Sequence, residues 1–413
     1  MASILVYTSP ARGHLFPALG ISLELRRRGH DVHVRTLADE VERVEALGLE
    51  AGAIDPAIEA RTLDDWRARN PLKALELTMR AFADRADREV EDLRRAVAET
   101  SAEALLVDTN SWGAQAAAEA FGLPWATFQP YFTPLPGKGV PPFGPGFKRA
   151  TGLLGRLRDG AVGKLVFGKM SAIALPGINA PRSRLGLAPL ETMGEFFTNP
   201  PRVLYLTAAA LEYPRLTWPD SFRLVGPVSW GPQCEEPEWL AGVDRPIVLV
   251  TCSTERQEDV AILKAALDGL PGDGFFVVAT SAAFTLDELG VPDRPHTRVE
   301  QFIPHDAILP RAAAVACHGG MGITQRALGR GVPVVVVPFG RDQLEVARRV
   351  EAASAGVRLS PKKLNPANLA AAVRRARSFG AGAQAVAQAF AEAGGERAAA
   401  DVFEELLAVR RSV

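Results

Sequence analysis

The stretch HGGMGITQRALGRGVPVVVVPFGRDQ, from His318 to Gln343, places three glycines between a histidine and a helical pattern. The apolar run at residues 313–317 predicts a buried strand before the glycines, and the run at 334–337 predicts the next strand. A helix that begins near Met321 would direct its unpaired N–H groups and its positive dipole end toward the turn. The stretch therefore predicts an α/β unit with a seat for an anion at the start of its helix.

The glycine turn predicts a phosphate-binding site. Gly319, Gly320 and Gly322 lack the Cβ atoms that would keep a ligand away from the backbone. His318 can donate a hydrogen bond from its ring, and Thr324 can donate one from its hydroxyl. A plain tight turn around a buried histidine is the alternative. A nicotinamide dinucleotide site is disfavoured, because the third glycine of G-x-G-x-x-G is missing.

The same alternation of strand, turn and helix runs along most of the 413 residues. It predicts parallel strands joined by right-handed crossovers, arranged as two doubly wound sheets. We expect an N-terminal domain at residues 1–228, a linker at 229–245 and a C-terminal domain at 246–413, whose last helix is a candidate to pack back on the first domain. The expected strands are residues 4–7, 32–34, 104–107, 247–251, 275–279, 313–316 and 334–337.

Residues 131–177 interrupt this alternation. The run LPGKGVPPFGPGFKRATG is rich in proline and glycine, which excludes a continuous helix or a central strand there. The segment predicts a long functional loop or flap, with a simple linker as the alternative. Within it, residues 153–170 mix cationic and apolar side chains, and a solvated amphipathic helix accounts for them more simply than a membrane contact.

Composition excludes several classes of protein. The formal net charge is −1, and no basic stripe is interleaved with aromatic residues, so a nucleic-acid partner is not expected. The cysteines Cys234, Cys252 and Cys317 form no C-x-x-C pair, which argues against structural zinc and against a redox pair. The N-terminus resembles no leader peptide, and no run of about 18 apolar residues occurs. The sequence predicts a cytoplasmic protein without a membrane span.

Together with TSPARGHLFPALGISLELRRRGH at residues 8–30 and RDQLEVARRVEAASAG at residues 341–356, the glycine stretch resembles a known donor-site signature. It is that of the nucleotide-sugar-dependent glycosyltransferases with the GT-B fold, in particular the bacterial natural-product branch of glycosyltransferase family 1, related to the UDP-glucuronosyl/UDP-glucosyltransferase superfamily. The resemblance covers almost the whole chain. It implies an α/β protein in which two Rossmann-like, doubly wound domains face each other across a cleft.

The resemblance implies a nucleotide-sugar site on the second domain. The diphosphate would rest on the glycine turn beside VTCSTERQ, and the nucleobase would lie at VEQFIPHDAIL, stacked on Phe302 and bound by the Ile303 backbone. Asp342 and Gln343 would hold sugar hydroxyls. The alternatives are a core position for Phe302 and a helix cap for the Asp-Gln pair. The implied donor-binding residues are Ser253, Thr254, Phe302, Ile303, His318, Gly319, Gly320, Gly322, Thr324, Asp342 and Gln343.

The resemblance also implies a catalytic pair on the first domain. His14 in GHLFPAL would be the general base for an acceptor hydroxyl, a task that suits an imidazole near neutral pH. Asp108 in LLVDTNSW would fix its tautomer and stabilise the imidazolium. A helix-start histidine and an aspartate N-cap are the alternatives. The segment with Phe132, Phe143 and Phe147 is one candidate wall of the acceptor pocket, and the helices expected at residues 61–94 are another.

One departure from the family pattern predicts which nucleoside the sugar donor carries. Many UDP-sugar enzymes of the family carry a glutamate for both ribose hydroxyls at the position of Arg326 here. A carboxylate accepts from both hydroxyls, whereas arginine only donates. A deoxyribose has no 2′-hydroxyl to satisfy, so the sequence favours a dTDP-sugar over a UDP-sugar. No Asp-x-Asp triplet occurs, so we expect no metal and no other cofactor.

The sequence thus predicts an inverting, metal-independent hexosyltransferase for a hydrophobic small-molecule aglycone, as in antibiotic biosynthesis. A nucleotide-sugar 2-epimerase of the same fold is one alternative, and it would need further acid and base groups around the sugar. A non-catalytic helper that binds a nucleotide sugar is another, and it would need no base. A homodimer is compatible with the sequence.

Overall fold

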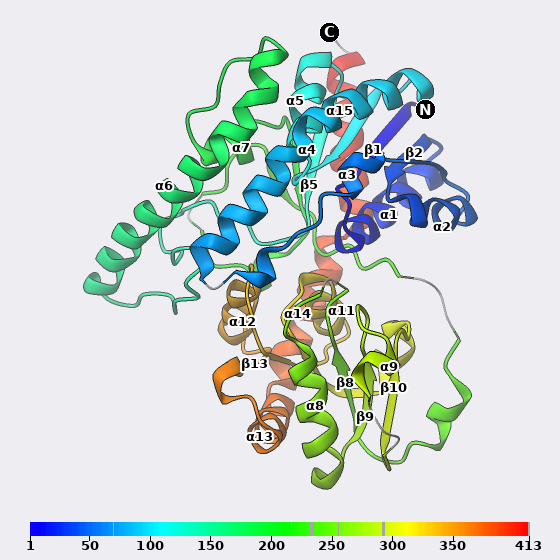
Figure 1. The fold of residues 1–413 in the computed structure, drawn as a ribbon, viewed down its shortest axis with the longest axis vertical. Coiled ribbons are helices and arrows are strands. Elements are labelled where there is room, and N and C mark those ends of the chain that lie inside the picture. The colour runs from blue at the N-terminus through cyan, green and yellow to red at the C-terminus, as the bar shows by residue number, and fades with distance from the viewer. Residues whose placement is uncertain (69, 216, 232–234, 255, 291–293, 412–413) are drawn as a thin grey trace.

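The computed structural model describes residues 1–68, 70–215, 217–231, 235–254, 256–290 and 294–411, so that Cys234 and part of the expected linker lie outside the described residues. Two parallel sheets with their helices form an upper and a lower body in Figure 1. This confirms the predicted fold class, an α/β protein with two doubly wound sheets.

The first sheet has seven strands in the order β3-β2-β1-β4-β5-β6-β7, and the second has six in the order β10-β9-β8-β11-β12-β13. The strands of the first sheet are β1 (Ser3–Tyr7), β2 (Asp31–Thr36), β3 (Glu50–Ala53), β4 (Ala104–Asp108), β5 (Trp125–Gln129), β6 (Val203–Tyr205) and β7 (Phe222–Leu224). Those of the second are β8 (Ile247–Thr251), β9 (Phe276–Thr280), β10 (Thr297–Glu300), β11 (Ala312–Cys317), β12 (Val334–Val336) and β13 (Gly356–Arg358).

Helices cover both faces of each sheet. They are α1 (Arg12–Arg27), α2 (Val41–Ala46), α3 (Pro56–Glu59), α4 (Pro71–Thr100), α5 (Trp112–Phe121), α6 (Leu153–Arg184), α7 (Met193–Thr198), α8 (Val260–Gly269), α9 (Leu286–Leu289), α10 (His305–Ile308), α11 (Met321–Gly329), α12 (Gln343–Ala352), α13 (Pro366–Arg377), α14 (Gly380–Ala393) and α15 (Glu396–Arg411). The last of these, α15, returns to the first sheet, where Phe403 packs in one apolar cluster with Leu15 and Leu19 of α1.

The seven strands that the sequence predicted are all present. Central strands such as β8 are buried along their whole length, because helices cover both faces of a parallel sheet. Such strands therefore appear in the sequence as uninterrupted apolar runs. The other strands, β3, β5, β6, β7, β10 and β13, were not predicted, since they are short or carry mixed residues.

The prediction of a loop across residues 131–177 is wrong beyond residue 152, where the helix that the sequence favoured for residues 153–170 is present. Residues 130–152 are irregular, but α6 then continues for 32 residues in spite of its glycines. Gly177 explains part of the difference, because a Cβ atom at this position would lie 2.4 Å from Cβ of Ala83 on α4. This glycine permits the close packing of two helices and does not interrupt the helix.

Among the described residues, α6 is the one helix that is long and apolar enough to cross a membrane, judged by length and composition alone. Only 17% of its most apolar window of 18 residues is buried in the fold. Its two halves differ, since the second half packs against α4, α5 and α7, whereas the first half projects away from the upper body (Figure 1).

A buried arginine joins the two domains. Arg349 of α12 is 2% exposed, and its Nε donates to Oε1 of Glu212 in the first domain at 2.8 Å. Its Nη1 donates to Glu345 Oε2 at 2.9 Å, and its guanidinium lies 4.2 Å from the ring centre of Phe132 and 4.3 Å from that of Tyr213. The prediction that Phe132 lines an acceptor pocket is wrong, because this ring is fully buried beneath the guanidinium.

Replacing Arg349 with leucine should destabilise the protein strongly, because Glu212 and Glu345 would remain buried without their counter-charge. Loss of one partner from a buried ion pair costs about 3–5 kcal/mol. Arg294→Leu is the control, since Arg294 pairs with Asp268 at the surface and its loss should change stability by less than about 1 kcal/mol. Thermal denaturation of both variants tests this, and equal, small shifts in Tm would contradict it.

Candidate active site

The predicted site residues collect at the carboxyl ends of the two sheets. In the first sheet the chain reverses its direction of winding between β1 and β4, where His14 follows β1 and Asp108 ends β4. In the second sheet the reversal lies between β8 and β11, where Ser253 follows β8 and His318 follows β11. Open α/β sheets bind their ligands in the crevices at such reversal points.

His14 and Asp108 are in direct contact. Nδ1 of His14 lies 2.9 Å from both carboxylate oxygens of Asp108, which is fully buried. Oδ2 of Asp108 also accepts from the N–H and the hydroxyl of Ser9, and Oδ1 accepts from the N–H of Asn110. Because Asp108 can only accept when ionised, Nδ1 of His14 carries a proton and Nε2 is left as the acceptor in the neutral ring.

The environment of Asp108 keeps it ionised. Burial raises its pKa, but the charge and hydrogen bond of His14, together with the bonds from Asn110 and Ser9, outweigh burial. The net result is a pKa below the ordinary value. The carboxylate is therefore available at neutral pH to orient the imidazole.

Two neighbours of His14 were not predicted from the sequence. Tyr131 donates its hydroxyl to Asn110 Oδ1 at 3.0 Å, and its ring lies 6.0 Å from that of His14. The amide Nδ2 of Asn110 lies 3.4 Å from Nε2 of His14. Burial, and then the charges of Asp108 and Asp342, raise the pKa of Tyr131 well above its ordinary value, so it remains a neutral phenol. Their positions just after β4 and β5 were the only signal in the sequence.

The glycine turn has the geometry expected of an anion seat. Gly320 is the N-cap of α11 and offers no side chain to the first N–H groups of the helix. A Cβ at Gly322 would have no heavy atom within 4 Å, so this side of the turn is open. Gly319 has φ +102°, and a Cβ there would lie 2.7 Å from Val336, so no other residue fits.

The other predicted donor residues differ in exposure. Phe302 is 61% exposed, and Thr254 is also exposed, so both are open to a ligand. Ile303 is buried, which leaves only its backbone available. Thr324 is fully buried with its hydroxyl 3.8 Å from Cys317 Sγ, so it does not face the open side of the turn in this structure.

Gln343 is engaged inside the protein. Its Oε1 accepts from the N–H groups of Phe339 and Gly340 at 2.7 and 3.2 Å, and its Nε2 donates to Gln257 Oε1 at 2.8 Å. Gln257 in turn donates to Asp259 Oδ2 at 3.1 Å. In this structure the side chain of Gln343 therefore stabilises the turn before α12.

A second histidine–aspartate contact lies behind the glycine turn. Nδ1 of His318 is 3.4 Å from Oδ2 of Asp259, which also accepts from the N–H of Ser253 at 2.5 Å. Burial raises the pKa of Asp259 to about 6, whereas burial and the charge of Arg341 lower the pKa of His318 to about 4. Sequence reasoning missed Asp259 and Gln257. The one sequence feature that could have indicated them is their position shortly after the Ser-Thr pair that follows β8.

The two clusters lie opposite each other across the domain interface. Arg341, which has φ +52°, donates from Nε and Nη2 to the two carboxylate oxygens of Asp65 in the first domain, at 2.8 and 2.9 Å. Burial raises the pKa of the adjacent Asp342, and the charges of Arg341 and His14 act in the opposite direction. Asp342 is thus close enough to His14 for the charge of a protonated His14 ring to lower its pKa.

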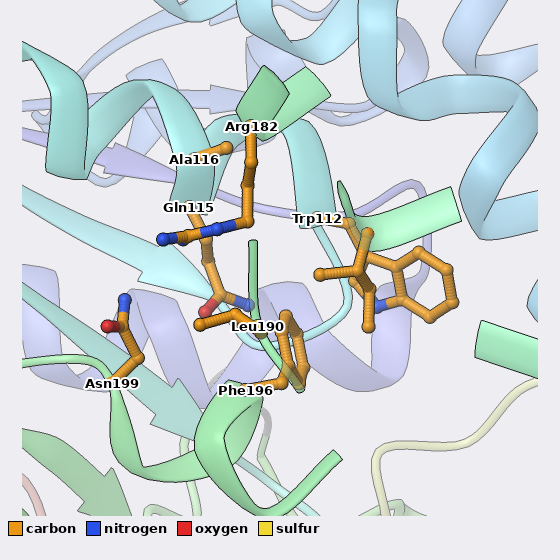
Figure 2. Close-up of a pocket in the computed structure, with 8 residues that line it drawn as sticks. Trp112, Gln115, Ala116, Arg182, Leu190, Phe196 and Asn199 are labelled. Carbon is orange, nitrogen blue, oxygen red and sulfur yellow. The ribbon is translucent and has the colours of Figure 1, made fainter. Parts of the chain in front are cut away.

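The cavity in Figure 2 is a packing gap and not a second substrate site. It lies inside the first domain, where Arg182 of α6 crosses it and pairs with Glu119 at 2.6 Å. Its free volume is about 10 Å³, roughly the space that one water molecule needs. The lining residues are Trp112, Gln115, Ala116, Ile178, Arg182, Leu190, Phe196 and Asn199.

His318 should be neutral at pH 5.5, where a free histidine is largely protonated, because burial lowers its pKa to about 4. The folded protein then holds fewer protons on this ring than the unfolded chain, so the contribution of His318 to stability rises from about pH 4 to pH 6.5. Nitrogen NMR of the imidazole tests this, with His318→Gln to assign the signal. A ring that titrates near pH 6.5 would contradict it.

Comparison with known proteins places this chain in a family. Residues 273–409 match the C-terminal domain described as Erythromycin biosynthesis protein CIII-like. The chain is 30% identical over 387 residues to 4′-demethylrebeccamycin synthase from Lentzea aerocolonigenes, which spans 90% of this chain and 91% of that protein. It is also 32% identical over 219 residues to a PGL/p-HBAD biosynthesis glycosyltransferase of Mycobacterium tuberculosis, over 52% of this chain and 50% of that protein.

Solved structures agree on the fold. The glycosyltransferase of kitacinnamycin superposes with a TM-score of 0.73 at 22% identity and covers 98% of this chain and 99% of its own. The Streptomyces sp. SF2575 glycosyltransferase SsfS6, solved with thymidine diphosphate, superposes with a TM-score of 0.71 at 20% identity, over 98% of this chain and 100% of its own. This chain therefore belongs to the natural-product glycosyltransferases of the GT-B fold.

Proposed function

We propose that this glycosyltransferase transfers a sugar from a dTDP-sugar to a hydroxyl group of a hydrophobic natural product, with inversion at the anomeric carbon and without a metal ion. The observation that carries the proposal is the His14–Asp108 pair at the reversal point of the first sheet. The electrostatic interaction of His14 with Asp342 supports a reaction between groups of the two domains.

The acceptor chemistry follows from the tautomer of His14. With Nδ1–H donated to Asp108, Nε2 takes the proton of the acceptor hydroxyl as that oxygen attacks the anomeric carbon. The bond from this carbon to the diphosphate oxygen breaks, and the nucleoside diphosphate leaves from the opposite face. Asp108 stabilises the imidazolium that forms. A single displacement of this kind inverts the configuration.

The donor side supplies charge stabilisation for the leaving group. The open N-terminus of α11 and the ring of His318 would hold the diphosphate as negative charge develops on it. Asp342 would accept hydrogen bonds from sugar hydroxyls, and Phe302, with most of its ring exposed, would stack on the base. These groups are our basis for proposing that no divalent cation is needed.

Two observations support thymidine as the nucleoside of the donor. Arg326, which stands where many UDP-sugar enzymes have a ribose-binding glutamate, donates to the carbonyl of Trp230 and lies 3.8 Å from Asp306. Its guanidinium offers no acceptor to a 2′-hydroxyl. Among the similar structures, SsfS6 was solved with thymidine diphosphate and VinC with dTDP.

The names of the similar proteins support a natural product as the acceptor. One relative is a rebeccamycin-pathway synthase, and another acts in PGL/p-HBAD biosynthesis. Similar structures include enzymes named for kitacinnamycin and calicheamicin. These names refer to different natural products. We therefore propose the class of acceptor and no individual compound.

Replacing His14 with alanine should reduce turnover by about 10²- to 10⁴-fold, the usual contribution of a general base. The affinity for dTDP should not change, because the proposed diphosphate site lies on the other domain. Asp108→Asn should also reduce turnover, since the amide no longer holds the required tautomer. Steady-state kinetics and calorimetry measure the two effects. Turnover within threefold of wild type in the His14 variant would remove it from the mechanism.

Calorimetric titration with dTDP and with UDP should show tighter binding of dTDP, and EDTA should change neither value. Arg326→Glu should narrow the difference, because a carboxylate can accept from the ribose hydroxyls of UDP. Arg330→Glu is a matched control, since Arg330 lies in the same region and also faces Asp306, at 3.6 Å. Equal or tighter binding of UDP by the wild type would overturn the proposed base preference but leave the glycosyltransferase assignment intact.

A further inference from the structure

The first part of α6, residues 153–169, has a surface that the reaction does not use. We call this segment the α6 arm, and it projects from the upper body in Figure 1. Four of its leucines are more than half exposed, namely Leu153 at 74%, Leu154 at 83%, Leu157 at 62% and Leu165 at 59%. Single exposed leucines are common on soluble proteins, but a group of four on one segment requires an explanation.

The exposed leucines form a stripe. Leu153, Leu157 and Leu165 are separated by multiples of four residues, and the exposed Ala161 fills the position between the last two. Residues four apart lie one above the other on a helix. The arm therefore presents to solvent an apolar ridge that winds partly around the helix, because each step of four residues adds about 40° of rotation.

Cations accompany the stripe. From residue 148 to residue 169 the chain carries six cationic side chains and one acidic one, although the whole protein has a formal net charge of −1. The acidic residue, Asp159, is already paired with Arg158 at 2.7 Å. The cationic residues are Lys148, Arg149, Arg156, Arg158, Lys164 and Lys169.

Charge and apolar surface together identify the partner. A second copy of the chain would bring the same cations face to face, and this repulsion disfavours self-association through the arm. An anionic lipid surface matches both features, because leucines enter the boundary of the acyl chains while lysine and arginine contact the headgroups. We propose that the α6 arm docks this enzyme on anionic membranes, with the helix lying in the plane of the surface.

The second half of α6 is held in the first domain, so the helix cannot cross a membrane. In the second half, Arg182 is buried and pairs with Glu119 of α5 at 2.6 and 3.1 Å. Gly177 packs so closely on Ala83 of α4 that this half cannot leave the domain without breaking its core. Only the arm is free to contact lipid.

Co-sedimentation of the full chain with vesicles tests the proposal and requires no activity. The protein should bind vesicles of phosphatidylcholine mixed with phosphatidylglycerol and should not bind vesicles of phosphatidylcholine alone. High salt should weaken the binding, because screening acts on the cations. This result does not depend on which sugar the enzyme transfers, so it can fail while the proposed function stands.

Two variants separate the contribution of the leucines to vesicle binding from that of the lysines. Replacing Leu153, Leu157 and Leu165 together with serine should weaken the partition into mixed vesicles at least about tenfold, since each buried leucine contributes substantially to such binding. Replacing Lys164 and Lys169 with glutamate should also weaken it at least about tenfold, because each cation near an anionic surface contributes about fivefold and each glutamate adds repulsion.

Matched controls come from the second domain. Leu286→Ser removes another exposed leucine, and the Lys362→Glu, Lys363→Glu double variant removes two exposed lysines. Both controls should bind mixed vesicles like the wild type. Absence of binding at low salt, or equal binding by the arm variants and the controls, would overturn the proposal. A wild-type dimer that the serine variant turns into monomers would overturn it as well, in favour of a second copy.

Discussion

The buried guanidinium of Arg349 fixes how the two domains face each other. It pairs with Glu212 from the first domain and Glu345 from its own helix, and its loss would leave both carboxylates buried without this counter-charge. Helix α12, which carries this arginine, begins directly after Asp342. The position of Asp342 opposite His14 thus depends on the interaction. Separating the two domains at this contact would leave the buried charges unpaired.

The sequence predicted the strands of the two sheets better than the contact between the two domains. Central strands are buried on both faces, so their apolar runs are visible without any knowledge of the neighbours. Arg349 belongs to an Arg-Arg pair in a helix, and nothing local distinguishes it from a solvated pair. Its burial comes from Glu212 and Tyr213, more than 130 residues earlier in the chain. The glycine at 177 was misread for the same reason, since its packing partner lies on another helix.

Some residues of the candidate site could likewise be predicted from the sequence, and others could not. His14, Asp108 and His318 could be placed because ligand-binding residues follow strands at the reversal points of α/β sheets. Gln257 and Asp259 could not, because their role is to hold other side chains and this appears only when the hydrogen bonds are known. Each domain nonetheless places a histidine against a buried aspartate at its reversal point. In the first domain the pKa of the aspartate lies below its ordinary value, and in the second domain the low pKa of the histidine suits a neutral hydrogen-bond partner.

The return of α15 to the first sheet affects how the protein is made. Phe403 of this helix completes the apolar cluster around Leu15 and Leu19 of α1, and Arg28 binds Asp401 and Glu404 across the same contact. A ribosome makes α1 early and α15 only after the entire second sheet. The N-terminal half therefore cannot fold to completion as it emerges, as N-terminal domains generally do. Its apolar surface on α1 stays uncovered until the last helix has been made. This enzyme therefore completes its folding as one unit, although it contains two domains.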